Sequence, residues 1–173
     1  MFVVVSPRDG SEHLPLLETM FKKRGGKDAH DTDKTIYIVY DNPTKSLFGS
    51  ARINPVSESI LTDVGLFDKK NCDTLGLLEL SLISFEDSSP YMDPNKEIFK
   101  SWFYTGLKEV LRIFALKKNL KGFISVNTPE SYQGCVEYGD FSFEEAFELP
   151  LQKENRSLYF GFLLFDEQAR LFA

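Results

Sequence analysis

Residues 75–85 of the chain have the sequence LGLLELSLISF, a nearly continuous apolar run interrupted by Glu79 and Ser81. A run of this length and composition is typical of a central β-strand that is covered on both faces. A carboxylate inside such a strand needs an explanation, because burying a charge is costly unless it is paired or used. Glu79 is therefore the first candidate for a functional residue.

Signals for a long helix follow this strand. Asp93 and Pro94 form a strong helix start, with Asp as the cap and Pro at the first helical position. Apolar residues then recur at helical spacing up to Phe114, and Asn119 is a plausible end. We expect this apolar stripe to pack in the core: Ile98, Phe99, Trp102, Phe103, Val110, Leu111 and Phe114.

The sequence before and after this predicted strand and helix indicates further strands and helices in a mixed order. Towards the N-terminus they predict a strand over 2–6, a helix over 11–25 and a hairpin formed by 35–40 and 46–53. Towards the C-terminus they predict strands over 122–126, 141–149 and 157–165, and a short helix over 129–138. Residues 54–74 are expected to form a long loop.

Composition indicates one ordered domain over residues 1–173. Hydrophobic residues make up 42% and charged residues 27% of the chain, and there are 16 Phe. The net charge of −6 argues against general binding to nucleic acid or anionic lipid. The apolar runs are too short to span a membrane, and the N-terminus lacks the basic region of a signal peptide, so we expect a cytoplasmic protein.

Cysteine and histidine usage predicts neither a disulfide nor a metal site. Cys72 and Cys135 are far apart and are expected to be free thiols. A metal at Asp28, His30 and Asp31 would lack a second pair of ligands at a familiar spacing, so we expect none.

The order of elements resembles the fold of the GCN5-related N-acyltransferase superfamily. That resemblance implies an α/β (α+β) class with a mixed, mostly antiparallel sheet and helices on both faces. In this fold the central strand and the next strand of the sheet diverge to admit an acyl thioester. The fold alone does not define the activity.

Several short motifs resemble those of the acyl-homoserine-lactone synthases, the autoinducer synthases of quorum sensing. The family's F-x-x-R corresponds to Phe21–Arg24 and its D-x-x-D to Asp28–Asp31. Its R-L-x-P segment corresponds to residues 52–55, and its central-strand E-x-S corresponds to Glu79–Ser81. The resemblance covers roughly the first half of the chain in motif order and the second half in element order.

This resemblance implies that the α-amine of S-adenosylmethionine attacks the thioester of an acyl-carrier protein, and that ring closure then releases methylthioadenosine. Glu79 would help to deprotonate the amine, and Arg52 would belong to the charged cluster around it. S-adenosylmethionine would be a substrate and not a permanently bound cofactor. The residues implied in substrate binding are Phe21, Arg24, Asp28, Asp31, Ser81, Trp102 and Phe103.

Structural interpretations of the same residues remain open. Glu79 could simply be neutralised by Arg52 or face a solvated edge, and Asp28 and Asp31 could be turn residues. The aromatic stripe of the long helix could be core, or part of it could line an acyl tunnel.

Two other activities also remain open. The first is an N-acyltransferase that uses acyl-CoA, although residues 86–94 contain no Gly to cradle a pyrophosphate. The second is a ligand-binding or partner-binding relative without catalysis, since Leu82 stands where the autoinducer synthases have Arg.

An acyl-carrier protein is strongly acidic, so a chain of net charge −6 would have to gather basic residues to attract one. Two clusters of basic residues qualify: Lys22, Lys23 and Arg24 with Lys27, and Lys108, Arg112 and Lys117 with Lys118 and Lys121. The solvated face of the predicted long helix explains the second cluster equally well.

Overall fold

The computed structural model describes residues 2–5, 36–41, 47–55, 75–82, 96–151 and 155–165 of the chain. These ranges contain one mixed sheet and two helices. The elements, in chain order, are β1 (Phe2–Val5), β2 (Ile36–Asp41), β3 (Leu47–Pro55), β4 (Leu75–Leu82), α3 (Lys96–Lys117), β5 (Gly122–Asn127), α4 (Pro129–Gly139), β6 (Glu144–Leu151) and β7 (Arg156–Leu164).

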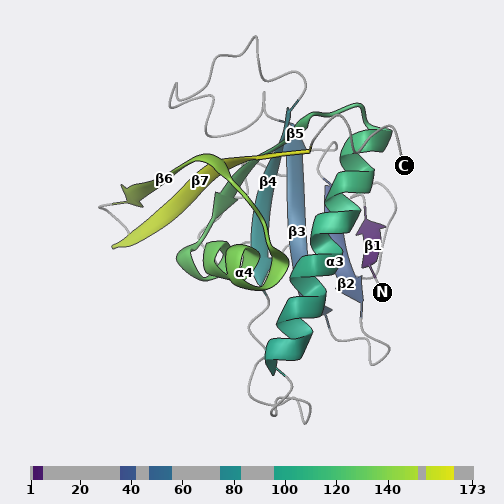
Figure 1. Cartoon of the computed structure of the whole chain (residues 1–173), viewed down its shortest axis with the longest axis horizontal. Coiled ribbons are helices and arrows are strands. Elements are labelled where there is room, and N and C mark those ends of the chain that lie inside the picture. The colour runs from purple at the N-terminus through teal and green to yellow at the C-terminus, as the bar shows by residue number, and fades with distance from the viewer. Residues whose placement is uncertain are drawn as a thin grey trace.

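The sheet has the strand order β1-β2-β3-β4-β5-β7-β6 (Figure 1). All neighbouring strands are antiparallel except β4 and β5, which are parallel and are joined through α3. The predicted mostly antiparallel sheet, with residues 75–82 as its middle strand, is therefore confirmed. The predicted hairpin is confirmed as well, because β2 pairs with β3 from Ile36 opposite Ile53 to Asp41 opposite Leu47.

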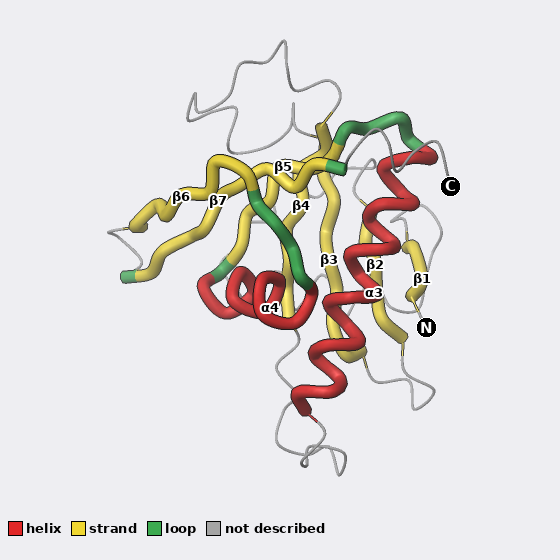
Figure 2. Tube along the Cα trace, viewed as in Figure 1, coloured by secondary structure: helices red, strands yellow, loops and turns green. Residues whose placement is uncertain are grey.

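Both described helices lie on the same side of the sheet, which we call the helix face (Figure 2). Helix α3 crosses β2 and β3, and α4 lies beside it below β6 and β7. The helix predicted over 11–25, which would supply the second layer, lies outside the described residues. The core on the helix face contains Ile38, Ala51, Ile53, Phe103, Tyr104, Leu107, Leu111, Ala115, Phe123, Cys135, Phe141 and Leu163.

The predicted long helix is present, but the expected composition of its buried face is partly wrong. Phe103 and Leu111 are buried, whereas Ile98 is 50% and Trp102 60% exposed. The buried positions of α3 recur every three or four residues from Phe103 to Ala115, and Trp102 projects about 100° away from Phe103 around the helix. The apolar residues of α3 therefore cover more than one face of the helix, and only tertiary packing decides which of them are buried in the core.

Helix α4 matches the short helix predicted over 129–138. It begins at Pro129 after an N-cap, Thr128, whose hydroxyl accepts a hydrogen bond from the Ser131 backbone N–H at 3.3 Å. It ends at Asp140, which has a left-handed backbone conformation with φ of 51°. Asn119, the expected end of the long helix, also has a positive φ of 55°.

The strand predicted over 141–149 begins three residues later, at Glu144. Phe141 and Phe143 precede it, and their rings stack with centroids 5.9 Å apart. Phe141 belongs to the core and Phe143 packs against it, so both side chains are used in the core before the strand begins. Within the described part of the chain, no helix is long and apolar enough to cross a membrane.

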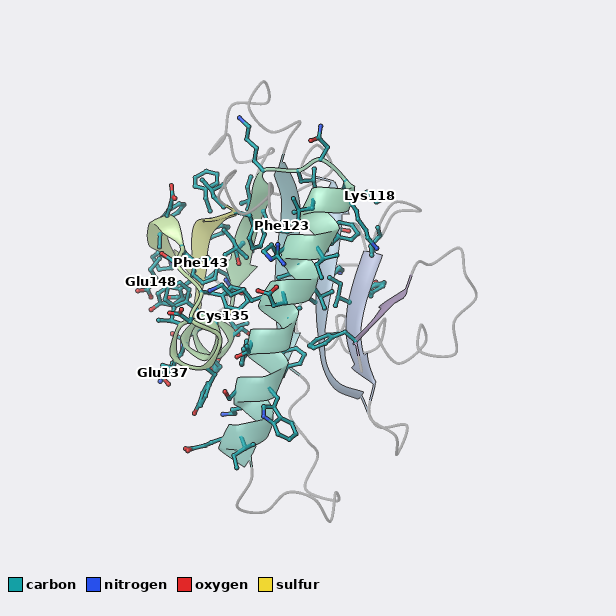
Figure 3. The ribbon with its side chains drawn as sticks, turned by 45° about the vertical axis from the view of Figure 1, so that its right-hand side comes forward. Lys118, Phe123, Cys135, Glu137, Phe143 and Glu148 are labelled. Carbon is teal, nitrogen blue, oxygen red and sulfur yellow. The ribbon has the colours of Figure 1, made fainter. Side chains whose placement is uncertain are left out.

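Gly134 sets the distance between α3 and α4. A Cβ at this position would overlap the ring and hydroxyl of Tyr104, which is fully buried. Tyr104 also stacks on Tyr138 of α4, with centroids 6.4 Å apart. Cys135 follows Gly134, lies inside the molecule as Figure 3 shows, and is a free thiol as predicted. Cys72 lies outside the described residues.

Candidate functional site

Strand β3 carries three polar side chains that are almost completely buried, and we call them the polar row. Ser50, Arg52 and Asn54 alternate along the strand with Ala51 and Ile53. Because Ala51 and Ile53 pack in the core on the helix face, the polar row lies on the opposite face of the sheet. Arg52 is only 4% exposed, and a buried guanidinium is costly unless it is paired or used.

The sheet register places Glu79 directly beside this row. In the antiparallel ladder of β3 and β4, Arg52 is opposite Glu79 and Ser50 is opposite Ser81. Directly opposite residues in such a ladder have Cβ atoms about 4.5–5.5 Å apart and share a face. The structure thus brings together the positions of three predicted site residues, Arg52, Glu79 and Ser81. Their roles in catalysis and substrate binding stay predictions.

The polar row also contains a hydroxyl that is free to bind. Among the described residues, nothing forms a hydrogen bond with Ser50 Oγ, although this atom is fully buried. Tyr37 of β2 lies opposite Arg52 on the other side of β3 and is buried as well. A polar environment of this kind, closed off from bulk water, can bind the ionic or hydrogen-bonding part of a small substrate.

The central strand β4 and its parallel neighbour β5, which the acyltransferase fold would have diverge, are paired over most of their length. Strands β4 and β5 stay paired from Leu75 opposite Gly122 to Leu80 opposite Asn127, which is the whole length of β5. Only Ser81 and Leu82 of β4 extend beyond that ladder, while they remain paired with β3 on the other side. The divergence that the resemblance implies is therefore not seen between Leu75 and Leu80 of β4, where the two strands are paired.

The remaining predicted substrate-binding residues are not all brought together. Trp102 and Phe103 project from different sides of α3, with Trp102 mostly exposed and Phe103 in the core. The structure therefore does not place this pair in one apolar tunnel. Phe21, Arg24, Asp28 and Asp31 lie outside the described residues, as do Lys22 and Lys23.

The described basic cluster is partly neutralised by neighbouring acidic groups. Lys108 Nζ donates a hydrogen bond to the backbone oxygen of Asp140 and lies 3.9 Å from its carboxylate. Arg112 forms an ion pair with Glu109 at 3.1 Å. Lys117 and Lys118 are exposed at the end of α3, where Figure 3 labels Lys118. Because α3 leads into the start of β5, these two residues lie at the opposite end of that strand from Asn127.

The sequence interpretation missed Asn127, the last residue of β5. Its side chain is buried, and its amide nitrogen donates a hydrogen bond to Ser125 Oγ at 2.6 Å. The predicted strand ended one residue earlier, at Val126. The signal that could have found it is a polar residue at the carboxyl end of a parallel strand, directly before a helix start, which is where α/β proteins commonly bind ligands.

An aromatic group borders this end of β5. Tyr159 of β7 lies opposite Asn127 and stacks on Tyr132 of α4, with ring centroids 4.8 Å apart. The Tyr159 hydroxyl donates a hydrogen bond to Glu148 at 3.2 Å, and the charge of Glu148 is the main cause that raises the pKa of Tyr159 above its ordinary value. Within the described ranges, no three His, Cys, Asp or Glu side chains gather as a metal ion would require.

The described sheet has one parallel pair of neighbouring strands, which α3 connects, and this order of elements defines an acyltransferase fold. Comparison with solved structures supports this assignment. The chain is similar to TofI, crystallised in an apo form, with a TM-score of 0.62 and 16% identity over 99% of this chain and 95% of TofI. It is also similar to BjaI, a CoA-dependent acyl-homoserine lactone synthase crystallised with MTA, with a TM-score of 0.58 and 14% identity over 99% and 86% of the two chains.

The similarity in fold extends to an N-acetyltransferase. A structure assigned as a phosphinothricin N-acetyltransferase has a TM-score of 0.54 and 10% identity over 96% of this chain and all of that one. No family model matches the sequence. No curated protein matches it at the level of sequence. At these identities the similarity demonstrates a shared fold, so the chain has the acyltransferase fold that was predicted.

Proposed function

We propose that this chain transfers an acyl group from a thioester to the α-amine of S-adenosylmethionine, as an acyl-homoserine-lactone synthase does. The observation that carries the proposal is the position of buried Arg52 opposite Glu79, beside the one parallel strand pair of an acyltransferase fold. Two of the similar structures support the choice of substrates, since TofI was crystallised in a ternary complex with an inhibitor and MTA, and BjaI with SAM and isopentyl-CoA.

In the first step, the amine nitrogen attacks the thioester carbonyl carbon. A C–N bond forms and the C–S bond breaks, and the sulfur leaves as a thiolate that takes up a proton. The Glu79 carboxylate accepts the proton that the amine loses. A cation opposite a carboxylate favours its ionised form, so Arg52 would keep Glu79 able to accept this proton.

In the second step, the carboxylate oxygen of the methionine part attacks the carbon bound to the sulfonium sulfur. An O–C bond forms, the C–S bond breaks, and the electron pair stays on sulfur, which leaves as the neutral thioether of methylthioadenosine. The negative carboxylate and the positive sulfonium cancel, so this step needs no proton transfer. It needs only that the acylated intermediate is held in a folded conformation.

The thioester would be carried by coenzyme A or by an acyl-carrier protein, because both present it on the same pantetheine arm. BjaI is a CoA-dependent enzyme with this fold, whereas residues 86–94 of the present chain contain no Gly to cradle a pyrophosphate, which favours a carrier protein. A carrier protein would meet positive charge at Lys117 and Lys118, which are exposed, more readily than at Lys108 and Arg112, which already have acidic neighbours.

The test is to incubate the purified chain with S-adenosylmethionine and an acyl donor, either acyl-CoA or acyl-carrier protein. Release of free thiol reports the first step, and formation of methylthioadenosine reports the second. We expect E79Q to lower both rates by at least about 100-fold, in the range of general-base catalysis. The matched control is E144Q, which changes an exposed carboxylate on β6 and should leave both rates unchanged.

Each result identifies one activity. Thiol release that needs another amine in place of S-adenosylmethionine would indicate an ordinary N-acyltransferase. Absence of thiol release with both donors would contradict the proposal and favour a binding protein.

A further inference from the structure

The solvent side of α3 carries large apolar residues at positions where a surface helix normally carries polar ones. Ile98, Trp102 and Ile113 are 50%, 60% and 43% exposed. The core positions of α3, from Phe103 to Ala115, lie on the other side of the helix. Residues that recur every three or four positions share one side of a helix, and we call the set on the solvent side the outer stripe. The outer stripe contains Ile98, Trp102, Thr105, Glu109, Ile113 and Leu116. Covering it would remove apolar surface from water.

The two polar members of the outer stripe already have partners within the chain. Thr105 Oγ1 donates a hydrogen bond to the backbone oxygen of Tyr138 at 3.3 Å. The Glu109 carboxylate lies 3.1 Å from the guanidinium of Arg112 and accepts a hydrogen bond from its Nε. A buried polar group is costly mainly when it has no partner. The outer stripe can therefore lose its water without leaving either of these side chains unpaired.

The order of residues in the outer stripe is nearly symmetric about its middle, which makes the stripe complementary to itself. When a second α3 is laid against it in the opposite direction with the middles aligned, Trp102 lies beside Ile113 of the second copy. Ile98 lies beside Leu116 of the second copy in the same register. Two-fold symmetry repeats each of these contacts, as in most dimers of identical chains. A second copy of this chain therefore supplies apolar surface where the first copy exposes it.

Exposed charges at the two ends of α3 favour the antiparallel direction. Glu97 is exposed in the first turn of the helix, and Lys117 and Lys118 are exposed at its end. Two antiparallel helices place the acidic start of one beside the basic end of the other, and their helix dipoles oppose each other. A parallel pair would instead bring like charges together at both ends. The charges thus select the same arrangement as the apolar residues.

We infer that two copies of this chain form a two-fold symmetric dimer in which their α3 helices pack antiparallel through the outer stripe. The contact extends from Ile98 to Leu116, which is about 27 Å of helix. Helix α3 lies over the helix face of the sheet, so the interface does not involve the polar row and does not depend on the proposed acyl transfer. A helix pair of this length forms a small interface, so we expect a reversible dimer with a Kd of about 1–100 μM.

The test is sedimentation equilibrium of the full chain without substrates, at concentrations between about 1 and 200 μM. The mean mass should rise from that of a monomer towards that of a dimer. I113E places an unpaired carboxylate in the apolar contact twice per dimer, so we expect it to raise the Kd at least about 10-fold. L164E is the matched control, because Leu164 is 42% exposed but alternates with Leu163, which lies in the core on the helix face. L164E should dimerise like the wild type.

Charge reversal tests the antiparallel direction. E97K and K118E should each raise the Kd by about 2- to 5-fold, because each removes an attraction between the ends of the paired helices. The double variant E97K/K118E has a basic start and an acidic end, so the attraction between the two copies returns. Its Kd should fall back to within about 2-fold of the wild-type value. Effects that simply add in the double variant would contradict the antiparallel contact.

Disulfide trapping tests the register without changing the charges at the helix ends. In a C72S background, in which Cys135 is buried, T105C mixed with E109C should form disulfides between the two variants, because these positions meet near the centre of the contact. Disulfides that join T105C to itself in preference would indicate a parallel pair and overturn the inference.

The dimer and the proposed function can fail separately. A chain that stays monomeric at all these concentrations, or a dimer that I113E does not weaken, would overturn the inference. Acyl transfer by such a monomer would retain the proposed function. A dimer that behaves as expected but transfers no acyl group would refute the function and retain the inference.

Discussion

Arg52 of β3 and Glu79 of β4 occupy directly opposite positions in the antiparallel ladder at the middle of the sheet. Buried Arg52 thus has an acidic residue at the opposite position of one of its two neighbouring strands. The same Glu79 is opposite Val126 of β5, the strand that runs parallel to β4. Opposite charges interact more strongly away from water than at a surface, so an ion pair at these two positions would affect both stability and proton transfer.

A double-mutant cycle of R52Q and E79Q should therefore reveal coupling between the two residues. We expect the free energies of unfolding to deviate from additivity by about 0.5–3 kcal/mol, with the double variant less destabilised than the sum of the single variants. Urea denaturation of the four proteins gives the values. The cycle of N54A and E144Q is the control for distant sites. Additive effects of R52Q and E79Q would mean that the side chains do not interact.

The substitution G134A should destabilise the protein although Ala favours helices. In an exposed helix the change from Gly to Ala stabilises by about 1 kcal/mol. At Gly134 the new methyl group would overlap the buried Tyr104, so we expect a net loss of about 1–3 kcal/mol in the free energy of unfolding. Q133A, at the neighbouring exposed position, should change stability by only a few tenths of a kcal/mol. A G134A variant as stable as the wild type would disprove the close contact of α3 and α4.

Tyr159 should ionise only above the ordinary tyrosine pKa of 10.0, because the charge of Glu148, some desolvation and the Glu148 hydrogen bond all favour the neutral phenol. A raised pKa in the folded state means that the folded protein binds this proton more tightly than the unfolded chain does. The contribution of this pKa difference to the free energy of unfolding is present below pH 10 and is lost as the pH rises through the pKa of Tyr159 in the folded state. Ultraviolet titration, with Y159F subtracted, should show the raised value in the wild type. E148Q should bring it back towards 10.0; the same value in both proteins would contradict this assignment.

Cys135 should be unreactive in the folded protein. Burial raises the pKa of its thiol far above the ordinary value, so almost no thiolate exists at neutral pH, and the side chain has no exposed surface. In a C72S background, we expect maleimide to label Cys135 at least about 100-fold more slowly in buffer than in urea. Mass spectrometry of the peptides gives both rates. Fast labelling in buffer would show that α4 opens from the sheet.

Local sequence patterns predicted most of the elements correctly. The apolar run around Glu79 indicated the central strand. The residues from Thr35 to Ile53 indicated the hairpin, and the residues after Pro129 indicated the short helix. These patterns work because the period of apolar residues, the caps and the turn residues act within a few positions of one another. The predicted start of β6 was wrong because the aromatic side chains before the strand pack on the core, and no local sequence pattern encodes that packing.

By itself, the sequence determined the order of strands and helices, their approximate ends and the presence of an unexplained acid in an apolar strand. Only the tertiary structure decided that Arg52 is opposite Glu79, that Trp102 stays outside the core, and that Asn127 is buried with an unused acceptor. The register between strands and the choice of a helix face depend on contacts between residues far apart in the chain. A shift of one residue would move every side chain of a strand to the other face of the sheet, so the candidate site exists only once the whole sheet is assembled.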